Sequence, residues 1–283
     1  MSAILIVNPF ATNVTEERVD AVVLALPPGV ETLHTKASGD ATTIAREVGK
    51  DVDTIYVFSG DGTYNEVVNG VSRDVRLGFL PGGGTSVLPR ALGLPRDPVE
   101  AAHVLAHGHT RRVSLGRVNG RRFAFNAGIG LDAELVRRVD GLGRKPDGRR
   151  AGDVAFVREG LKFGAAHRFR LEPTIELGGI GRGAFAMVAN CCPYTYMGSL
   201  GLRFAPKATF EGGLDLVAPE RVGLPSLVWW AFGQGRGHIR AHDADRFELR
   251  CDVPMPLQVD GEDLGDIEEA SFEAERAAVT VIV

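Results

Sequence analysis

The sequence predicts two domains: an N-terminal α/β domain with a doubly wound parallel sheet, followed by a mostly antiparallel β-sandwich domain. In the first third of the chain, short apolar runs alternate with segments of helical spacing, a pattern typical of parallel strands joined by helices. From Arg111 onward, short alternating runs are separated by glycine turns, which is typical of antiparallel sheets. We therefore expect domains at 1–110 and 111–283, and the final apolar run, Ala277–Val283, could join either sheet.

The elements of the first domain follow from the spacing of apolar residues and from helix start signals. The expected elements, in chain order, are strand Ala3–Val7, helix Glu16–Leu26, strand Val30–His34, helix Asp40–Lys50, strand Thr54–Phe58, helix Thr63–Val71, strand Arg76–Leu80 and helix Pro98–His107. The second domain is expected to contain strands in the runs RRVSLGRV, RRFAFNAG, RFRLEPTIEL, GAFAMVAN and GLDLVAP, with a helical run at Ala133–Val139.

This order of elements also predicts where a ligand binds. In doubly wound sheets the ligand lies beyond the carboxyl ends of the strands. Asn8, Thr35, the loop Ser59–Thr63 and the loop Gly82–Thr85 would all lie there.

Composition excludes several classes of protein. A net charge of −4 argues against general nucleic-acid binding, which usually needs a basic excess. The three cysteines, Cys191, Cys192 and Cys251, lack metal-ligand spacing and indicate a reducing compartment. The apolar stretch Leu224–Phe232 is too short to span a bilayer, and the N-terminal residues lack the features of an export signal. We expect a cytoplasmic enzyme.

The most informative segment is FSGDGTYNEVVNG, Phe58–Gly70, which follows an apolar strand. Gly60 and Gly62 would let the backbone turn tightly and approach a ligand, and the helix that follows would direct amide N–H groups at phosphate oxygens. Asp61 would repel a bare phosphate but would suit a magnesium-bound nucleotide. The alternative is local structure: Asp-Gly is a common turn, and Thr63 with Glu66 would form a capping box.

A second glycine cluster supports the phosphate interpretation. The segment LPGGGTSVLPRALGLP, Leu80–Pro95, again follows an apolar run and carries three glycines before Thr85. Two such loops close together in sequence predict that both face one ligand.

Two acidic residues of the second domain are candidate site residues with ordinary structural alternatives. Glu262 lies in VDGEDLG, which also reads as a hairpin with solvated acidic flanks. Asp132 begins a helical run and could be its N-cap.

Taken in order, the motifs NPFAT, FSGDGTYNEVVNG, LPGGGTSVLPRALGLP, FNAGIGLDAELV, APKATFEGGLDLVAP and LQVDGEDLG span nearly the whole chain. In this order the chain resembles the diacylglycerol kinase catalytic-domain family, which includes bacterial soluble lipid kinases and sphingosine kinases. The GDGT segment alone is also similar to NAD kinases; the distant DGE makes the resemblance specific. The resemblance implies a nucleotide-binding α/β domain, a β-sandwich domain, an active cleft between them, and ATP-dependent phosphorylation of a lipid hydroxyl.

Position by position, the resemblance implies roles for particular residues. Asp61 would be the central Mg-ATP residue, Glu262 would accept the proton of the attacking hydroxyl, and Asp132 would be a further acidic residue of the site. ATP and Mg²⁺ are the expected cofactors. The expected nucleotide contacts are Asn8, Thr35, Ser59, Gly60, Asp61, Gly62, Thr63, Asn65, Glu66, Gly84 and Thr85.

Several positions depart from the family pattern. Ala11 and Thr12 replace the usual Ser-Gly of the first motif, and Ser59 replaces a glycine, as in sphingosine kinases. Ser86 stands where Asn is usual, and Pro89 where a small helix former is usual. Because Ser has a shorter side chain than Asn, nucleotide affinity or base preference could differ.

The family also has a second Mg²⁺ site in the segment equivalent to Lys207–Asp215. Glu211 matches one ligand and the Gly213 carbonyl another, whereas Ala208 replaces a further acidic ligand. The sequence leaves this site open.

The resemblance implies a lipid substrate and contact with a membrane surface, and the net charge leads us to expect no nucleic-acid partner. The basic run Arg137–Arg150 and the pair Trp229 and Trp230 fit such contact, although a solvated loop and core tryptophans fit the same residues. The oligomeric state is open, with a homodimer allowed. Two other functions remain as alternatives: an NAD-kinase-like phosphotransferase and a non-catalytic nucleotide or lipid binding module.

Overall fold

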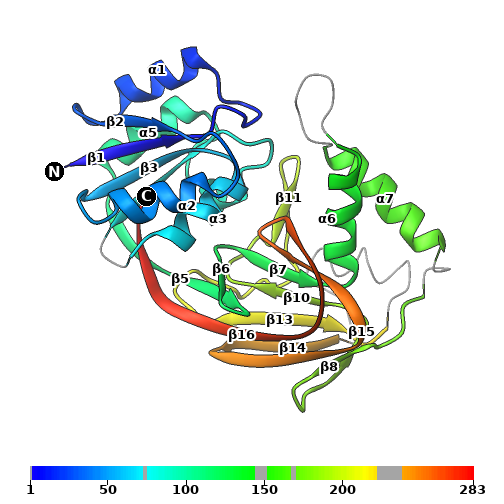
Figure 1. Cartoon of the computed structure of the whole chain (residues 1–283). Helices are drawn as coiled ribbons and strands as arrows, with labels where there is room; N and C mark the ends of the chain where they lie inside the picture. The colour runs from blue at the N-terminus through cyan, green and yellow to red at the C-terminus, as the bar shows by residue number, and fades with distance from the viewer. Residues whose placement is uncertain (1, 73–74, 144–151, 167–169, 222–237) are drawn as a thin grey trace. The chain divides into compact units, whose positions relative to one another are not determined.

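The computed structural model describes residues 2–72, 75–143, 152–166, 170–221 and 238–283 (Figure 1). Contacts group the chain into two units, the first made of Met1–Ser114 with Arg276–Val283 and the second of Leu115–Glu275. Strands β5 (Thr110–Val118) and β16 (Glu262–Ile282) contribute residues to both units.

The first unit is an α/β unit, as predicted. Its strands pair in parallel in the order β16, β4, β3, β1, β2. Because the chain passes from β1 to β2 on one side and later to β3 on the other, the strand order reverses between β1 and β3. Ligands of doubly wound sheets bind at such a point. The elements before β5 are β1 (Ala3–Val7), α1 (Glu16–Ala25), β2 (Glu31–His34), α2 (Asp40–Val48), β3 (Thr54–Ser59), α3 (Asp61–Gly70), β4 (Arg76–Pro81), α4 (Val87–Ala91) and α5 (Pro98–His107).

Helices pack in pairs on the sheet of the first unit, α1 with α5 and α2 with α3 (Figure 1). Side chains define several of the helix starts. The Thr15 hydroxyl accepts a hydrogen bond from the Arg18 amide at the start of α1. Asp97 accepts from two amides at the start of α5, where Pro98 has no amide hydrogen to leave unsatisfied. All six residues of β3 are buried, which explains its unbroken apolar run.

The second unit is built mainly of antiparallel strands, which confirms the predicted fold class. Strands β14, β13, β10, β7, β15 and β16 lie in that order, and β8 pairs with β15 and β9. Phe272 lies at the centre of its core, against the rings of Phe123 and Phe247. The elements after β5 are β6 (Arg121–Phe123), β7 (Asn126–Ile129), α6 (Leu131–Gly141), α7 (Asp153–Ala166), β8 (Ile175–Leu177), β9 (Gly181–Gly183), β10 (Ala186–Ala189), β11 (Thr195–Met197), β12 (Leu200–Leu202), β13 (Leu214–Pro219), β14 (His238–Ala244) and β15 (Arg246–Val259).

Strand β16 shows which sheet the final apolar run, Ala277–Val283, joins. Its first part pairs antiparallel with β15, and its last part pairs in parallel with β4, Thr280 beside Arg76 and Val281 beside Leu77. The end of the chain therefore completes the parallel sheet of the first unit.

Two features predicted for membrane contact lie at least partly beyond the described structure. Trp229 and Trp230 fall outside the described residues, as do residues 144–150 of the basic run. In the part of the chain that is described, no helix combines the length and apolar character needed to cross a membrane.

Candidate active site

Three loops come together at the carboxyl ends of β1, β3 and β4. The backbone N and side-chain Nδ2 of Asn13 donate to the carbonyl oxygens of Gly82 and Gly83, each at 2.8 Å. Gly82 N donates to the Ser59 carbonyl at 2.6 Å. These bonds hold both glycine loops and the loop after β1 together at one edge of the sheet.

The two glycine loops touch through glycine backbone. A Cβ on Gly83 would lie 2.8 Å from the Cα of Gly60, and a Cβ on Gly60 would lie 3.3 Å from the Cα of Gly83. By contrast, a Cβ on Gly62 or Gly84 would meet no atom of the structure within 4 Å. Gly60 and Gly83 thus allow the loops to pack, whereas Gly62 and Gly84 leave backbone open to a ligand, the arrangement expected for a shared ligand.

Asp61 joins the two loops. It is the first residue of α3, and its carboxylate accepts hydrogen bonds from the backbone N of Val87 at 3.0 Å and of Leu88 at 3.1 Å, in the first turn of α4. The side chain therefore lies at two helix N-termini, where a negative charge is stabilised. Each carboxylate oxygen has more than one acceptor position, so a cation can bind there while both amide bonds remain. The residues fit a magnesium-bound phosphate.

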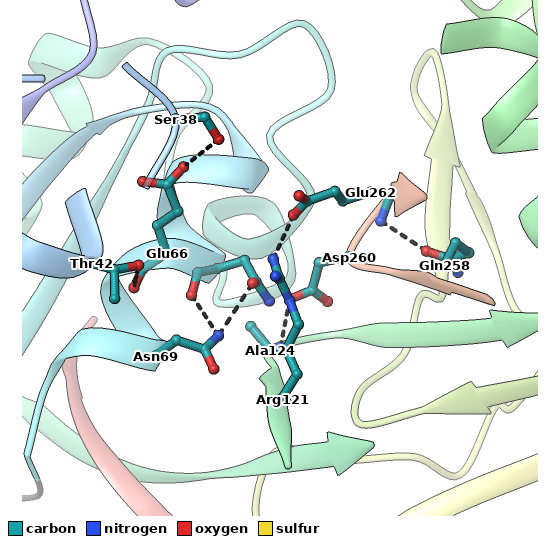
Figure 2. Close-up of polar contacts among 11 residues, drawn as sticks. Ser38, Thr42, Glu66, Asn69, Arg121, Ala124, Gln258, Asp260 and Glu262 are labelled. Atoms are coloured by element: carbon teal, nitrogen blue, oxygen red, sulfur yellow. Dashed lines mark hydrogen bonds and ion pairs between the residues drawn. The ribbon is translucent and has the colours of Figure 1, made fainter. Parts of the chain in front are cut away.

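The capping-box interpretation of this segment is wrong. Helix α3 begins at Asp61, two residues before the predicted start, and its N-cap is Gly60, with no side-chain cap. Thr63 lies inside the helix. Glu66 reaches the neighbouring helix α2 instead, where its carboxylate accepts from Ala41 N at 3.1 Å. Figure 2 shows Glu66 with its further contacts to α2 and the preceding turn, from Thr42 and Ser38.

The hydroxyl of Thr63 lies where the strand order reverses. It accepts from Asn8 Nδ2 at 3.1 Å and from Ser59 Oγ at 2.7 Å, so one threonine links the ends of β1 and β3. Ser59 is fully buried and Thr63 is 6% exposed. Both side chains therefore support the Ser59–Thr63 loop from the protein interior.

Burial separates the predicted nucleotide contacts into two groups. Thr35 and Asn65 are buried like Ser59 and Thr63, and the Asn65 carbonyl and side-chain oxygens both accept from Asn69 Nδ2 (Figure 2). Asn8 and Thr85 are partly exposed, and Gly62 and Gly84 are exposed. Direct contact with ATP stays a prediction for all of these residues.

Tyr64 is a supporting residue that the sequence analysis did not identify. Its hydroxyl lies 2.6 Å from the carbonyl oxygens of both Ser59 and Leu80. Complete burial raises the pKa of Tyr64 well above its usual value, so it remains a donor. It ties the ends of β3 and β4 together below the loops. In the sequence, the only sign of this role is that a large aromatic residue directly follows the glycine loop.

The departures at Ser86 and Pro89 have clear structural consequences. Ser86 is the N-cap of α4 with φ of 48°, a left-handed conformation in which Asn is favoured over Ser. Its Oγ compensates by accepting from Gly83 N at 3.1 Å. Pro89 is the third residue of α4, where an amide would have no intrahelical partner, so the helix tolerates it.

In the second unit, the DGE segment forms a two-residue β-hairpin, as its residues alone suggested. Val259 pairs with Glu262, and the turn residues Asp260 and Gly261 have φ of 48° and 80°. Positive φ at both turn positions is the geometry that Asp-Gly favours.

Asp260 anchors this hairpin in the interior of the second unit. Its buried carboxylate accepts hydrogen bonds from the backbone N of Ala124 at 2.7 Å, Phe125 at 3.0 Å and Asn126 at 3.1 Å. The sequence analysis did not identify this role. A charge with several backbone donors is well compensated, so the hairpin has a defined position.

Glu262 follows the turn on the exposed side of the hairpin. Its carboxylate forms an ion pair with Arg121 of β6, with Nη2 and Oε2 2.5 Å apart (Figure 2). The Glu262 side chain is 45% exposed. Arg121 was not predicted from sequence because 141 residues separate the two.

Asp132 is not the N-cap of α6, which corrects one alternative for this residue. The N-cap is Gly130, without a side-chain cap. Instead, the Asp132 carboxylate accepts from Tyr194 OH at 2.8 Å and Gln258 Nε2 at 2.6 Å, and burial raises its pKa. Gly128 makes room for it, because a Cβ there would overlap Asp132 Oδ2.

The predicted second metal site has no supporting cluster. Gly213 N donates to Asp243 Oδ1 at 2.6 Å, and Asp215 accepts from His242 Nδ1 at 2.7 Å. Among the described residues, no three or more His, Cys, Asp or Glu side chains are grouped to hold a metal. Ligation by Glu211 and the Gly213 carbonyl stays an untested prediction.

Comparison with known proteins establishes the family. Residues 2–118 match the model of the diacylglycerol kinase catalytic domain. A diacylglycerol kinase from Bacillus subtilis is 32% identical over 243 residues, which cover 81% of this chain and 77% of that protein. The chain belongs to the diacylglycerol kinase family.

Solved structures agree with this fold. A diacylglycerol kinase from Bacillus anthracis superimposes with a TM-score of 0.72 at 23% identity, covering 99% of this chain and 96% of that one. An NAD kinase from Archaeoglobus fulgidus in complex with ATP gives a TM-score of 0.53 at 14% identity, covering 99% and 93%. At these identities the similarity shows the fold alone.

Family membership confirms the predicted resemblance and the prediction of an enzyme. As a member of the diacylglycerol kinase family, the chain is a kinase and, at the level of the family, a lipid kinase. The prediction of a non-catalytic module is therefore not supported.

Proposed function

We propose that the protein transfers the γ-phosphate of Mg-ATP to a hydroxyl of diacylglycerol or a related lipid. The observation that carries this proposal is the position of Asp61, whose carboxylate is held by Val87 N and Leu88 N between two touching glycine loops. This arrangement supports the binding of a metal-bound phosphate, and membership of the family supports a lipid as the class of acceptor.

In this proposal the first unit binds and orients the nucleotide. The open backbone at Gly62 and Gly84 would face the phosphates, beside the start of helix α3. Asp61 would hold the magnesium. When bound, Mg²⁺ would neutralise charge on the phosphate oxygens during transfer. Phosphoryl transfer needs little covalent participation from the protein, so positioning and charge stabilisation are the main requirements.

The second unit supplies the proton acceptor. A primary alcohol is a weak nucleophile, and a positioned carboxylate can take its proton as the oxygen attacks the γ-phosphorus. Glu262 is partly exposed and projects from a hairpin that Asp260 anchors. Arg121 forms an ion pair with Glu262 and so fixes the direction of its carboxylate.

The decisive experiment measures transfer of labelled γ-phosphate from Mg-ATP to diacylglycerol, monoacylglycerol, sphingosine and NAD. Wild type is compared with Glu262→Ala and with Glu268→Ala, an exposed glutamate of the same strand. We expect label in a lipid, lost by about 10²- to 10⁴-fold in Glu262→Ala and retained in Glu268→Ala. Label in NAD alone would contradict the lipid acceptor, and an unchanged rate in Glu262→Ala would remove Glu262 from the mechanism.

The proposal includes transient contact with a membrane surface, because the acceptor lies in one. Helix α7 carries large apolar side chains exposed to solvent at helical spacing: Val154 at 83%, Val157 at 50% and Leu161 at 56%. Cosedimentation with vesicles should decrease in Val154→Glu/Leu161→Glu. It should be unchanged in Leu24→Glu, which replaces an exposed leucine of α1. Equal binding by both variants would contradict contact through α7.

A further inference from the structure

Gln258 lies at the centre of a buried polar network in the second unit. It belongs to β15, pairs with Gly128 of β7, and is 2% exposed. Its Nε2 donates to Asp132 Oδ2 at 2.6 Å and to Asn126 Oδ1 at 2.9 Å. Its Oε1 accepts from Gly261 N at 2.9 Å, a bond drawn in Figure 2. Both ends of the amide are therefore used.

The orientation of this amide follows from its partners. A backbone N–H can only donate, so the group facing Gly261 must be the oxygen. The NH₂ group then faces the Asp132 carboxylate, which can only accept when ionised. Asn126 completes the pattern, because its own Nδ2 donates to the Tyr194 carbonyl at 2.7 Å. The network is consistent in one arrangement only.

Gly261 is the turn residue immediately before Glu262. The Gln258 side chain thus connects a partly buried carboxylate, that of Asp132, to the turn that carries the proposed proton acceptor. Asp260 is the other residue of this turn, and its carboxylate is held by three backbone amides. With both turn residues held, Glu262 has little freedom to shift relative to Asp132.

We propose that Gln258 is a positioning residue of the kinase, which holds the Asp132 carboxylate and the Glu262 turn in one fixed relation. This inference rests on the proposed function, since it assigns Glu262 the role of base. Glutamine suits the position because it offers a donor and an acceptor at the end of one side chain. Glutamate lacks the donor, methionine lacks both, and asparagine is one methylene shorter.

Tyr194 provides the second donor to Asp132 and acts beside Gln258. Its hydroxyl is buried, lies 2.8 Å from Asp132 Oδ2, and lies 3.3 Å from Gln258 Nε2. The Asp132 carboxylate is partly removed from water and therefore depends on such donors. Loss of either donor would let the carboxylate move.

The test compares Gln258→Met and Gln258→Glu with wild type, measuring kcat, KM for ATP and the pH dependence of kcat. A displacement of about 1 Å at a reacting group can lower the rate by about 10²-fold. We expect Gln258→Met to lower kcat by about 10- to 100-fold with KM for ATP changed less than about 2-fold. A wild-type kcat in Gln258→Met would overturn the proposal.

Gln258→Glu gives a readout that a purely structural role would not produce. Two carboxylates would then face each other at the distance of a hydrogen bond and share one proton at low pH, as interacting carboxylates do. We expect its kcat to approach that of wild type at low pH and to fall as pH rises over a range where wild type is constant. A pH profile parallel to that of wild type would overturn the proposal.

Folding and the proposed function need separate controls. Melting temperatures show whether each variant folds. Tyr194→Phe repeats the test with a milder change, and Tyr196→Phe of β11 is its control.

Amide hydrogen exchange at Gly261, followed by NMR, needs no substrate. The exchange should accelerate in Gln258→Met, and unchanged exchange would overturn the link between Gln258 and the turn. Wild type without lipid phosphorylation would instead overturn the proposed function, and with it the positioning role.

Discussion

Gly60 and Gly83, which follow β3 and β4, lie against each other with no room for a side chain at Gly83: a Cβ there would be 2.8 Å from the Cα of Gly60. Real Cβ atoms essentially never approach another atom this closely, and the obstacle is backbone, which cannot rotate away. This contact sets the spacing of the two loops on either side of Asp61.

Gly83→Ala should therefore separate the loops and weaken nucleotide binding. We expect the KM for ATP to rise about 10-fold, equivalent to about 1.4 kcal/mol, with a smaller effect on the lipid KM. Steady-state kinetics with each substrate varied in turn check this. Gly84→Ala, whose Cβ would meet no atom of the structure within 4 Å, should melt at the wild-type temperature. If Gly83→Ala binds ATP as wild type does, the loop contact has no part in nucleotide binding.

Asp61→Ala should reduce both stability and activity, because the side chain caps α4 and is the proposed metal contact. Loss of a capping carboxylate costs about 1–2 kcal/mol of unfolding free energy. Asp97→Ala is a matched control, since Asp97 also accepts from two amides at a helix start, those of Val99 and Glu100. We expect similar losses of stability by denaturant unfolding, with Mg-dependent turnover abolished only in Asp61→Ala. A normal Mg-dependent rate in Asp61→Ala would contradict its metal role.

Asp132→Asn should change how stability depends on pH. Burial raises the pKa of Asp132, so the folded state binds its proton more tightly than the unfolded state. The corresponding stability is fully present below the usual aspartate pKa of about 3.9 and is lost as pH rises through the raised value. The asparagine variant has no such loss. Its melting temperature relative to wild type should therefore increase between about pH 4 and neutral pH while activity falls; a constant difference would contradict this prediction.

Glu275→Gln should have the opposite pH dependence. Hydrogen bonds from Arg122, with Arg117 nearby, lower the pKa of Glu275, so its stabilisation is present above the usual glutamate pKa and is lost as pH falls through the lowered value. Its side chain is 30% exposed, and screening limits the expected loss in the variant to about 1 kcal/mol at pH 7. The difference should be smaller at pH 3 than at pH 7.

Denaturant unfolding at both pH values measures this loss. Glu273→Gln is the control, because Glu273 is 46% exposed and 3.4 Å from Arg246. A loss of stability in Glu275→Gln that persists undiminished at pH 3 would show that packing, and not the charge, is responsible.

Local sequence patterns predicted most of the fold. Alternating apolar and helical runs predicted β1 to β4 and their helices to within a few residues, because apolar spacing reflects which face of an element is buried. The two glycine loops and the DGE turn could also be predicted, because glycine and Asp-Gly favour particular backbone conformations wherever they occur. Asp61 was identified from its place between two loop glycines, and Glu262 from the resemblance to the family; the roles of both in catalysis stay predictions.

The sequence alone thus determined the fold class, the family, and the positions of the glycine loops and the hairpin. Tertiary structure decided which side chains those elements meet. The Asp61 carboxylate accepts from amides 26 and 27 residues away, at Val87 and Leu88. The Asp132 carboxylate accepts from donors 62 and 126 residues away, at Tyr194 and Gln258. No local pattern records such partners, since hydrogen bonds between distant residues form only once the strands that carry them are paired.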